Sequence, residues 1–366
     1  MRIAFCGGGT GGHVYPALAV AAALRKLTEG PEPEMLYIGV RGKADREIAA
    51  REGLRFRDVT AGPLRGGSRL GMVSGSVKLA AGLAQSLSIL RGFKPDVVFA
   101  SGGYGSVGVG LAARMLRIKL LLFLPDVEAG MAVKTLARVA NRIAVTVPEA
   151  QAQFPGKKTV LTGYPVREAF FTAERTSARE ALGLDPLLPT LLVSGASSGA
   201  SRLNHAVASW ANDFLEIGQL MHLCGQADEA WLRAGIEKLP KELAERYHLY
   251  SYLHEEMPLA LAAADLAVMR SGASVLGELP AARLPAILVP GEYEGGYDQF
   301  ANARFMEANE AAVVLPQERI EELHSMVMYL INNETRLTNM RAALGKLARP
   351  EAAEDLARLV MEMAGK

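Results

Sequence analysis

A histidine stands directly after a glycine-rich turn near the start of the chain. His13 belongs to residues 6–20, which read CGGGTGGHVYPALAV and follow a short apolar segment. A glycine loop between a strand and a helix binds anions, because its backbone N–H groups and the helix N-terminus point at the ligand. Imidazole titrates near neutral pH and can accept a proton there. The run therefore indicates an anion site with a general base within reach.

The same glycines also satisfy the spacing G-x-G-x-x-G, as Gly7, Gly9 and Gly12. In a dinucleotide-binding fold this spacing is accompanied by an acidic residue about 20 positions later, which holds the ribose. Here the second predicted strand leads through Gly39 and Val40 to Arg41, which could instead hold the 2′-phosphate of NADP. An NADP-dependent oxidoreductase is therefore one alternative for this chain.

Two further glycine loops and one polar segment extend the pattern. The loops are residues 101–110 and 194–204, which read SGGYGSVGVG and SGASSGASRLN. The polar segment, residues 269–303, carries Glu278 within an otherwise apolar helical pattern. A carboxylate in such a place needs a partner. It can accept hydrogen bonds from both hydroxyls of a ribose, or it can form a salt bridge with Arg270 or Arg283.

Composition limits the class of protein. The chain has 366 residues, 50% of them hydrophobic, and a formal net charge of +1, which argues against a dedicated nucleic-acid binder. Cys6 and Cys224 are predicted to be buried thiols in a reducing compartment. Neither a signal peptide nor a membrane-spanning run is expected. The sequence thus predicts a protein that is soluble or lies on a membrane surface.

Short apolar runs alternate with helical patterns and must position these loops. This alternation predicts an α/β fold with parallel sheets covered on both faces. Gly163 and Pro165 interrupt it, after which the order of strand, glycine loop and helix begins again. We therefore predict two Rossmann-like, doubly wound domains facing each other across a cleft, residues 1–163 and 164–345, with the C-terminal helix 346–366 packing back onto the first. The predicted strands are Arg2–Cys6, Met35–Gly39, Asp96–Ala100, Lys119–Leu124, Asn141–Val147, Thr190–Ser194, Gln219–Cys224, His248–Tyr252, Leu266–Met269 and Ala286–Val289.

Together, these segments resemble the MurG family of glycosyltransferases. The matching runs span nearly the whole chain in the family's order: GGTGGHVYPALAV (8–20), SGGYGSVGVGLAA (101–113), GYPVR (163–167), SGASSGASRLN (194–204), RSGASVLGELPAARLPAILVP (270–290) and DQFANA (298–303). The resemblance implies the GT-B fold and an inverting transfer of N-acetylglucosamine from UDP-N-acetylglucosamine to undecaprenyl-diphosphoryl-muramoyl-pentapeptide. It also implies that the second domain binds the donor and the first binds the acceptor.

The resemblance assigns site residues position by position. Glu278 matches the residue that holds the uridine ribose, and Gln299 matches one that reads the sugar hydroxyls. The implied donor-binding residues are Arg167, Gly195, Ser197, Gly199, Leu253, His254, Ser271, Glu278, Asp298 and Gln299. The implied acceptor-binding residues are Thr10, Gly11, Gly12, His13, Gly102, Gly103 and Tyr104. No bound metal or other cofactor is expected.

One loop departs from the family pattern. Residues 123–130 read FLPDVEAG, where the family has a His-Glu-Gln-Asn run. We expect Asp126 and Glu128 to face the cleft, and one of them to orient the acceptor or assist His13. The predicted catalytic residues are therefore His13, Asp126 and Glu128. Two alternatives stay open: a GT-B transferase with another lipid or polyprenyl-linked acceptor, and a non-catalytic sugar-nucleotide-binding subunit.

A membrane surface is the remaining predicted partner. Residues 74–94 place Val77, Leu83, Leu87 and Leu90 near one side of a helix, with Lys78, Arg91 and Lys94 nearby. Such a helix could rest on anionic lipid or simply pack inside the fold. If the helix rests on anionic lipid and the acceptor is lipid-linked, the protein is predicted to be a peripheral enzyme on the cytoplasmic face of the plasma membrane.

Overall fold

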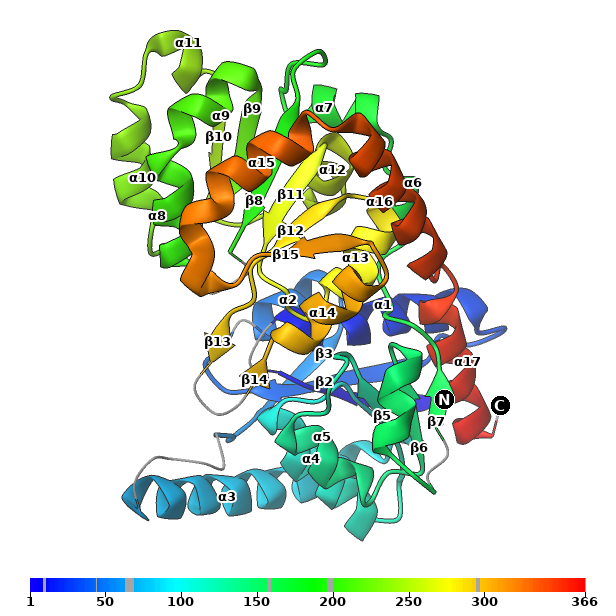
Figure 1. Cartoon of the computed structure of the whole chain (residues 1–366). Coiled ribbons are helices and arrows are strands. Elements are labelled where there is room, and N and C mark those ends of the chain that lie inside the picture. The colour runs from blue at the N-terminus through cyan, green and yellow to red at the C-terminus, as the bar shows by residue number, and fades with distance from the viewer. Residues whose placement is uncertain are drawn as a thin grey trace. The chain divides into compact units, whose positions relative to one another are not determined.

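The computed structural model describes residues 1–365 apart from residues 9–10, 44, 63–68, 157–158, 196–199 and 294–296; for residues 11, 69–74, 292–293 and 297–298 it describes the backbone alone. The chain divides into two compact units (Figure 1). Unit 1 is Met1–Val166, Tyr293–Tyr297 and Arg349–Lys366, and unit 2 is Arg167–Glu292 and Asp298–Ala348.

Unit 1 contains a seven-stranded parallel sheet in the order β3-β2-β1-β4-β5-β6-β7. Its strands are β1 (Arg2–Cys6), β2 (Glu34–Val40), β3 (Arg55–Val59), β4 (Val97–Ala100), β5 (Lys119–Leu124), β6 (Arg142–Val145) and β7 (Thr159–Leu161). Its helices are α1 (Gly11–Leu27), α2 (Asp45–Arg51), α3 (Arg69–Phe93), α4 (Tyr104–Met115), α5 (Met131–Ala137), the 3-10 helix η1 (Pro148–Gln153) and α17 (Ala352–Ala364).

Unit 2 contains a six-stranded parallel sheet in the order β10-β9-β8-β11-β12-β15. Its strands are β8 (Thr190–Ser194), β9 (Gln219–Leu223), β10 (Tyr247–Tyr250), β11 (Leu266–Met269), β12 (Ala286–Leu288) and β15 (Ala312–Val314). Its helices are α6 (Ala169–Thr172), α7 (Arg175–Ala181), α8 (Ser201–Ser209), α9 (Ala211–Ile217), α10 (Glu229–Ile236), α11 (Lys241–Ala244), α12 (Met257–Ala263), α13 (Val275–Ala282), α14 (Phe300–Ala308), α15 (Leu323–Ile331), α16 (Glu334–Leu347) and the 3-10 helix η2 (Gln317–Glu322). The short strands β13 (Glu292–Tyr293) and β14 (Tyr297–Asp298) pair with each other.

The strand order of each sheet determines where ligands can bind. In unit 1 the chain moves outward from β1 to β3 and then returns to place β4 beside β1. In unit 2 it does the same with β8 and β11. In open parallel sheets, ligands bind at the carboxyl ends of the strands where the order reverses. The loops after β1 and β4, and those after β8 and β11, are therefore the expected sites.

The central strands are apolar because both faces of each sheet are covered. In β1, residues Ile3 to Cys6 are all 0% exposed, and the strands on either side of it are also buried. Such strands read as continuous hydrophobic runs rather than alternating ones. Both sheets are parallel and doubly wound, which confirms the predicted fold class.

The C-terminal helix α17 completes unit 1. It contacts α1, and Leu356, Ala357 and Val360 on it are fully buried. Two ion pairs hold it at its ends: Lys26 with Glu354 at 3.3 Å, and Arg142 with Glu362 at 2.9 Å.

Candidate functional site

In unit 1, one hydrogen bond fixes the orientation of the His13 ring. His13 lies in the first turn of α1, and its Nδ1 is 2.9 Å from the carbonyl oxygen of Ser101, just after β4. Because a carbonyl only accepts, Nδ1 carries the proton in this contact. The other nitrogen, Nε2, then holds a lone pair and can accept a proton from a ligand.

The second glycine loop makes room for that ring. Gly102 and Gly103 have φ angles of 91° and 74°, a region that side chains rarely adopt. A Cβ atom at Gly103 would lie 3.3 Å from Cδ2 of His13 and 2.5 Å from the carbonyl oxygen of Gly8. The hydroxyl of Ser101 also donates to the carbonyl oxygen of His13, at 2.5 Å. The loops after β1 and β4 therefore form one unit around His13.

Asp126 and Glu128 follow the next strand of the same sheet, β5. Asp126 is 9% exposed, whereas Glu128 is exposed. The Gln153 amide holds the loop between them, accepting from the backbone N–H of Ala129 at 2.8 Å and donating to the carbonyl of Val127 at 2.6 Å. The two carboxylates thus lie in different surroundings, and Glu128 is the one open to solvent.

In unit 2, Arg167 connects two other predicted donor-binding residues. Its guanidinium donates to the backbone carbonyl of His254 at 2.8 Å. Burial raises the pKa of Glu278, while a hydrogen bond with Ser274 and the charge of Arg167 oppose that rise. No salt bridge joins Glu278 to Arg270 or Arg283 among the described contacts. Glu278 is a half-buried carboxylate beside a cation, which suits an acceptor of hydroxyl hydrogen bonds.

The loops after β11 and β12 are joined through Gln299. This side chain is 4% exposed, and its Oε1 accepts from the backbone N–H of Gly291 at 2.9 Å. The Ser271 hydroxyl donates to the Gln299 carbonyl at 3.0 Å, and Asn302 donates to the Ser271 carbonyl at 3.1 Å. Since its oxygen is engaged, Gln299 has its Nε2 group available for donation. That group lies 3.8 Å from where a Cβ on Gly272 would be.

A buried polar chain behind the donor loop was missed from the sequence. Asn204 on α8 donates to Asp228 at 2.7 Å and lies 3.0 Å from Nε2 of His222, whose Nδ1 is 2.7 Å from the Tyr247 hydroxyl. Burial lowers the pKa of His222 to about 4, so the ring is neutral. The Asn204 oxygen therefore accepts from Nε2, and Tyr247 donates to Nδ1. These hydrogen bonds fix the start of α8 against β9. In the sequence, only Asn204, the final residue of the SGASRLN run, points to them.

The other predicted residues fall as follows. Gly12 accepts a hydrogen bond from the Tyr164 hydroxyl at 3.2 Å, and Gly195 donates from its backbone to Leu223 at 3.3 Å. Leu253 is buried, and Tyr104 begins α4. Thr10, Ser197 and Gly199 lie outside the described residues, and of Gly11 and Asp298 only the backbone is described. Across the described ranges, no three His, Cys, Asp or Glu residues form a group that could hold a metal ion.

Comparison with known proteins agrees with this arrangement. Residues 3–145 match the glycosyltransferase family 28 N-terminal domain, and residues 190–356 match the glycosyltransferase family 28 C-terminal domain. Among solved structures, MurG of Acinetobacter baumannii is similar with a TM-score of 0.72 and 25% identity, covering 99% of both chains. A UDP-GlcNAc 2-epimerase of Neisseria meningitidis, at 11% identity and a TM-score of 0.67 over 99% of this chain and 100% of that one, shares the fold.

Curated relatives match over nearly their full length. Proteins of Roseiflexus sp. (36% identity, 98% of this chain and 94% of the relative) and Desulforudis audaxviator (37%, 100% and 99%) are both named UDP-N-acetylglucosamine–N-acetylmuramyl-(pentapeptide) pyrophosphoryl-undecaprenol N-acetylglucosamine transferase. This chain belongs to that family of glycosyltransferases.

Proposed function

We propose that this protein transfers N-acetylglucosamine from UDP-N-acetylglucosamine to the muramoyl 4-hydroxyl of undecaprenyl-diphosphoryl-MurNAc-pentapeptide. The observation that carries the proposal is full-length identity of 34–37% to transferases named for this reaction. The local geometry supports it in each unit. In unit 2, Glu278 lies within the electrostatic reach of Arg167, and Gln299 joins the loops after β11 and β12. In unit 1, the loop after β4 orients His13.

In the proposed reaction, the acceptor oxygen attacks the anomeric carbon from the face opposite the diphosphate. A carbon–oxygen bond forms, the bond to UDP breaks, and Nε2 of His13 takes the hydroxyl proton. Charge develops on the leaving diphosphate. The N-terminus of α8 and the guanidinium of Arg167 stabilise that charge.

A radiolabel assay tests the function directly. The purified protein is incubated with tritiated UDP-N-acetylglucosamine and either the muramoyl-pentapeptide lipid or plain undecaprenyl phosphate. We expect label in the lipid phase with the first acceptor and none with the second. Label on undecaprenyl phosphate alone would identify a transferase with a different acceptor, and UDP binding without transfer would identify a binding subunit.

The loop that carries Asp126 and Glu128 gives a prediction about the acceptor. Gln153→Ala removes both hydrogen bonds that hold residues 127–129. We expect the KM for the acceptor to rise about three- to tenfold, in line with about 1 kcal/mol for a net hydrogen bond, while UDP affinity stays unchanged. Gln151→Ala is the matched control, because Gln151 lies on the same 3-10 helix but contacts Thr159 instead. Equal acceptor KM values in both variants would contradict a role for this loop.

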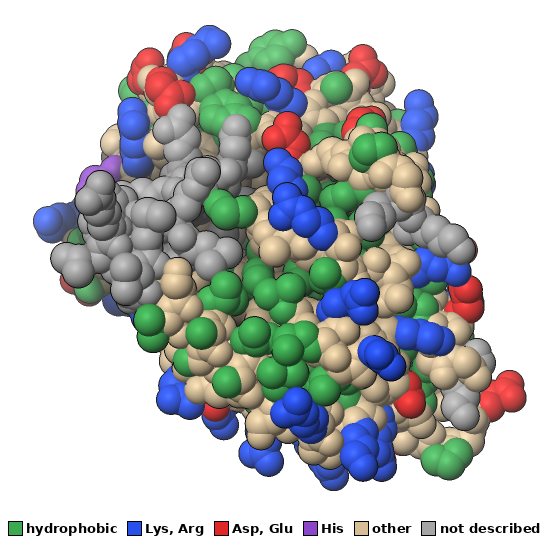
Figure 2. Space-filling view, turned by 90° about the horizontal axis from the view of Figure 1, so that it is seen from below, with side chains coloured by type: hydrophobic (Ala, Val, Ile, Leu, Met, Phe, Trp, Pro, Cys, Tyr) green, Lys and Arg blue, Asp and Glu red, His purple; other side chains and the backbone are tan. Residues whose placement is uncertain are grey.

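We also propose that unit 1 binds an anionic membrane surface. Helices α3, α4 and α5 contain no acidic residue. α4 contacts both α3 and α5. Val77 and Met115 are each 62% exposed and Met131 is 42% exposed, and Lys and Arg residues are exposed around them. Figure 2 shows hydrophobic side chains gathered on one face, with Lys and Arg at its margins.

The structure corrects one part of the predicted lipid-facing side. Leu90 is fully buried, and Leu83 and Leu87 are half-buried, because this side of α3 packs inside unit 1. Of the four apolar residues predicted to face lipid, Val77 is the one that is exposed. The exposed Met115 and Met131 were not predicted to belong to this surface. No helix in the described part of the chain has the length and apolar character that a bilayer span requires.

Vesicle flotation tests the membrane proposal. Each basic residue near an anionic surface contributes about 1 kcal/mol, so we expect Arg114→Glu combined with Arg117→Glu to lower binding to phosphatidylserine vesicles at least tenfold. The matched control is Lys238→Glu combined with Lys241→Glu in unit 2, which makes the same change in charge. Binding that does not depend on anionic lipid, or that is equal in the two variants, would contradict the proposal.

A further inference from the structure

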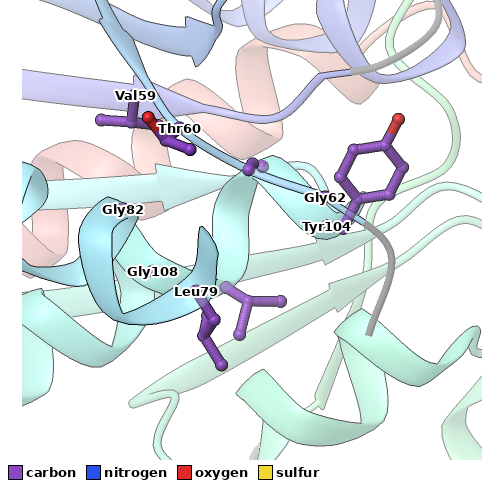
Figure 3. A pocket seen from close by; sticks show the side chains of 10 residues that line it. Val59, Thr60, Gly62, Leu79, Gly82, Tyr104 and Gly108 are labelled. Carbon is purple, nitrogen blue, oxygen red and sulfur yellow. The ribbon is translucent and has the colours of Figure 1, made fainter. Parts of the chain in front are cut away.

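A small pocket opens where the end of β3 meets α3 and α4. Figure 3 shows Val59 and Thr60 from the end of β3, Leu79 and Gly82 from α3, and Tyr104 and Gly108 from α4 around one space. Its free volume is about 10 Å³, which is room for one group the size of a water molecule or a methyl. The pocket is therefore too small for a sugar ring, or for more than one methyl-sized group.

Close backbone packing determines this size. A Cβ atom on Gly108 would lie 3.3 Å from the backbone of Gly82, and one on Gly82 would collide with the carbonyl oxygen of Thr60. The side chains that complete the wall are mainly apolar: Val59 and Val107 are each 1% exposed, and Leu79 is half-buried. An apolar group of methyl size fits this environment better than a polar one.

A cation lies beside one residue of the pocket wall. Lys78 runs across Gly62, a residue of the pocket wall, so that a Cβ on Gly62 would be 3.0 Å from Cδ and 3.9 Å from Nζ of Lys78. Tyr104 and Gly105 belong both to the pocket wall and to the first turn of α4, directly after the Gly102–Gly103 loop beside His13. Unit 1 therefore places an ammonium group next to the wall of a methyl-sized, mainly apolar recess.

We infer that this pocket receives the methyl branch of the first isoprene unit of the acceptor, with Lys78 contacting the adjoining phosphate. An isoprene unit next to a diphosphate carries one methyl branch close to the phosphate, whereas a straight alkyl chain has none. The inference rests on the proposed function, because it assumes a polyprenyl diphosphate acceptor. It adds that the enzyme recognises the branching of the lipid as well as its sugar and peptide.

Two soluble acceptor analogues separate the branch from the phosphate. Both carry the muramoyl-pentapeptide diphosphate, one on a neryl group and the other on an unbranched deca-2,6-dienyl group of equal carbon number and unsaturation. We expect the wild-type KM to be about fourfold lower for the neryl analogue, the effect of burying one methyl-sized group. Equal KM values for the two would overturn the inference.

Variants then locate the preference. Ala61→Leu places a side chain in the pocket and should abolish the preference by raising only the neryl KM, whereas Ala80→Leu, on exposed α3 surface, should retain it. If Ala61→Leu does not fold, Leu79→Ala removes the largest aliphatic side chain of the wall and should reduce the preference. Lys78→Gln should raise the KM for both analogues by the same factor. Lys94→Gln, the matched control, should leave both KM values unchanged.

A preference that survives Ala61→Leu would show that the pocket holds water only. Wild-type protein that binds UDP but transfers sugar to neither analogue would contradict the proposed function itself. Wild-type protein that reacts equally well with both analogues would contradict only the inference about the pocket.

Discussion

His13→Ala is expected to lower kcat about a hundredfold or more, the usual size of a general-base effect. The reason is the orientation of the ring: Nδ1 is committed to the Ser101 carbonyl, and Nε2 is left to accept the proton of the attacking hydroxyl. Because His13 lies in unit 1 and the proposed donor residues lie in unit 2, the Kd for UDP should be unchanged. Steady-state kinetics and calorimetry measure the two quantities.

His13→Gln separates catalysis from structure in the same experiment. The glutamine amide can still donate to the Ser101 carbonyl but cannot act as a base. We expect turnover as low as in His13→Ala, with wild-type thermal stability. Wild-type turnover in either variant would transfer the base role to Asp126 or Glu128, and a parallel loss of UDP affinity would make His13 a structural residue.

Glu278→Ala is expected to weaken UDP binding by about 1–3 kcal/mol, a factor of about 5 to 150. The lost interaction is a carboxylate that accepts from the ribose hydroxyls. Glu278→Gln should lose less, because its amide oxygen still accepts one hydrogen bond. Calorimetry with 2′,3′-dideoxyuridine diphosphate, which lacks both hydroxyls, should give the same affinity in all three proteins.

Unchanged UDP affinity in Glu278→Ala would return this residue to a structural role. The pH dependence gives a second check, best measured with uridine because it has no titrating phosphate. Burial raises the pKa of Glu278, so the carboxylate becomes protonated at a higher pH than an ordinary glutamate does. Wild-type uridine affinity should therefore begin to fall at a higher pH on acidification, and Glu278→Gln should lack that fall.

Central and edge strands differed in how well the sequence predicted them. β1, β5, β8 and β11 were predicted with their observed bounds, because burial on both faces gives uninterrupted apolar runs. The strands of the two large sheets that were missed, β3, β7 and β15, all lie at sheet edges, and the short pair β13 and β14 was not predicted either. β3 reads RFRDV and is half-exposed, so its charged residues concealed it. An edge strand that faces solvent has no composition that separates it from a loop.

The candidate site was predictable in its residue types but less so in its contacts. The glycine loops and His13 could be recognised because phosphate binding requires small residues between a strand and a helix. The Gln153 contacts with residues 127–129, and the chain from Tyr247 to Asp228, join segments far apart in sequence. No local pattern encodes such pairs, since each side chain alone is an ordinary polar residue.

The position of α17 has a consequence for biosynthesis. Unit 1 begins at Met1 but needs residues 352–364, whose buried Leu356 and Val360 cover part of its core. Domains fold as units as the chain emerges from the ribosome, at about 5–20 residues per second. Both segments of unit 2, Arg167–Glu292 and Asp298–Ala348, are synthesised before α17. The half of the protein that is translated first is thus the half that is completed last, and until then the surface of α1 that α17 will cover stays open to chaperones.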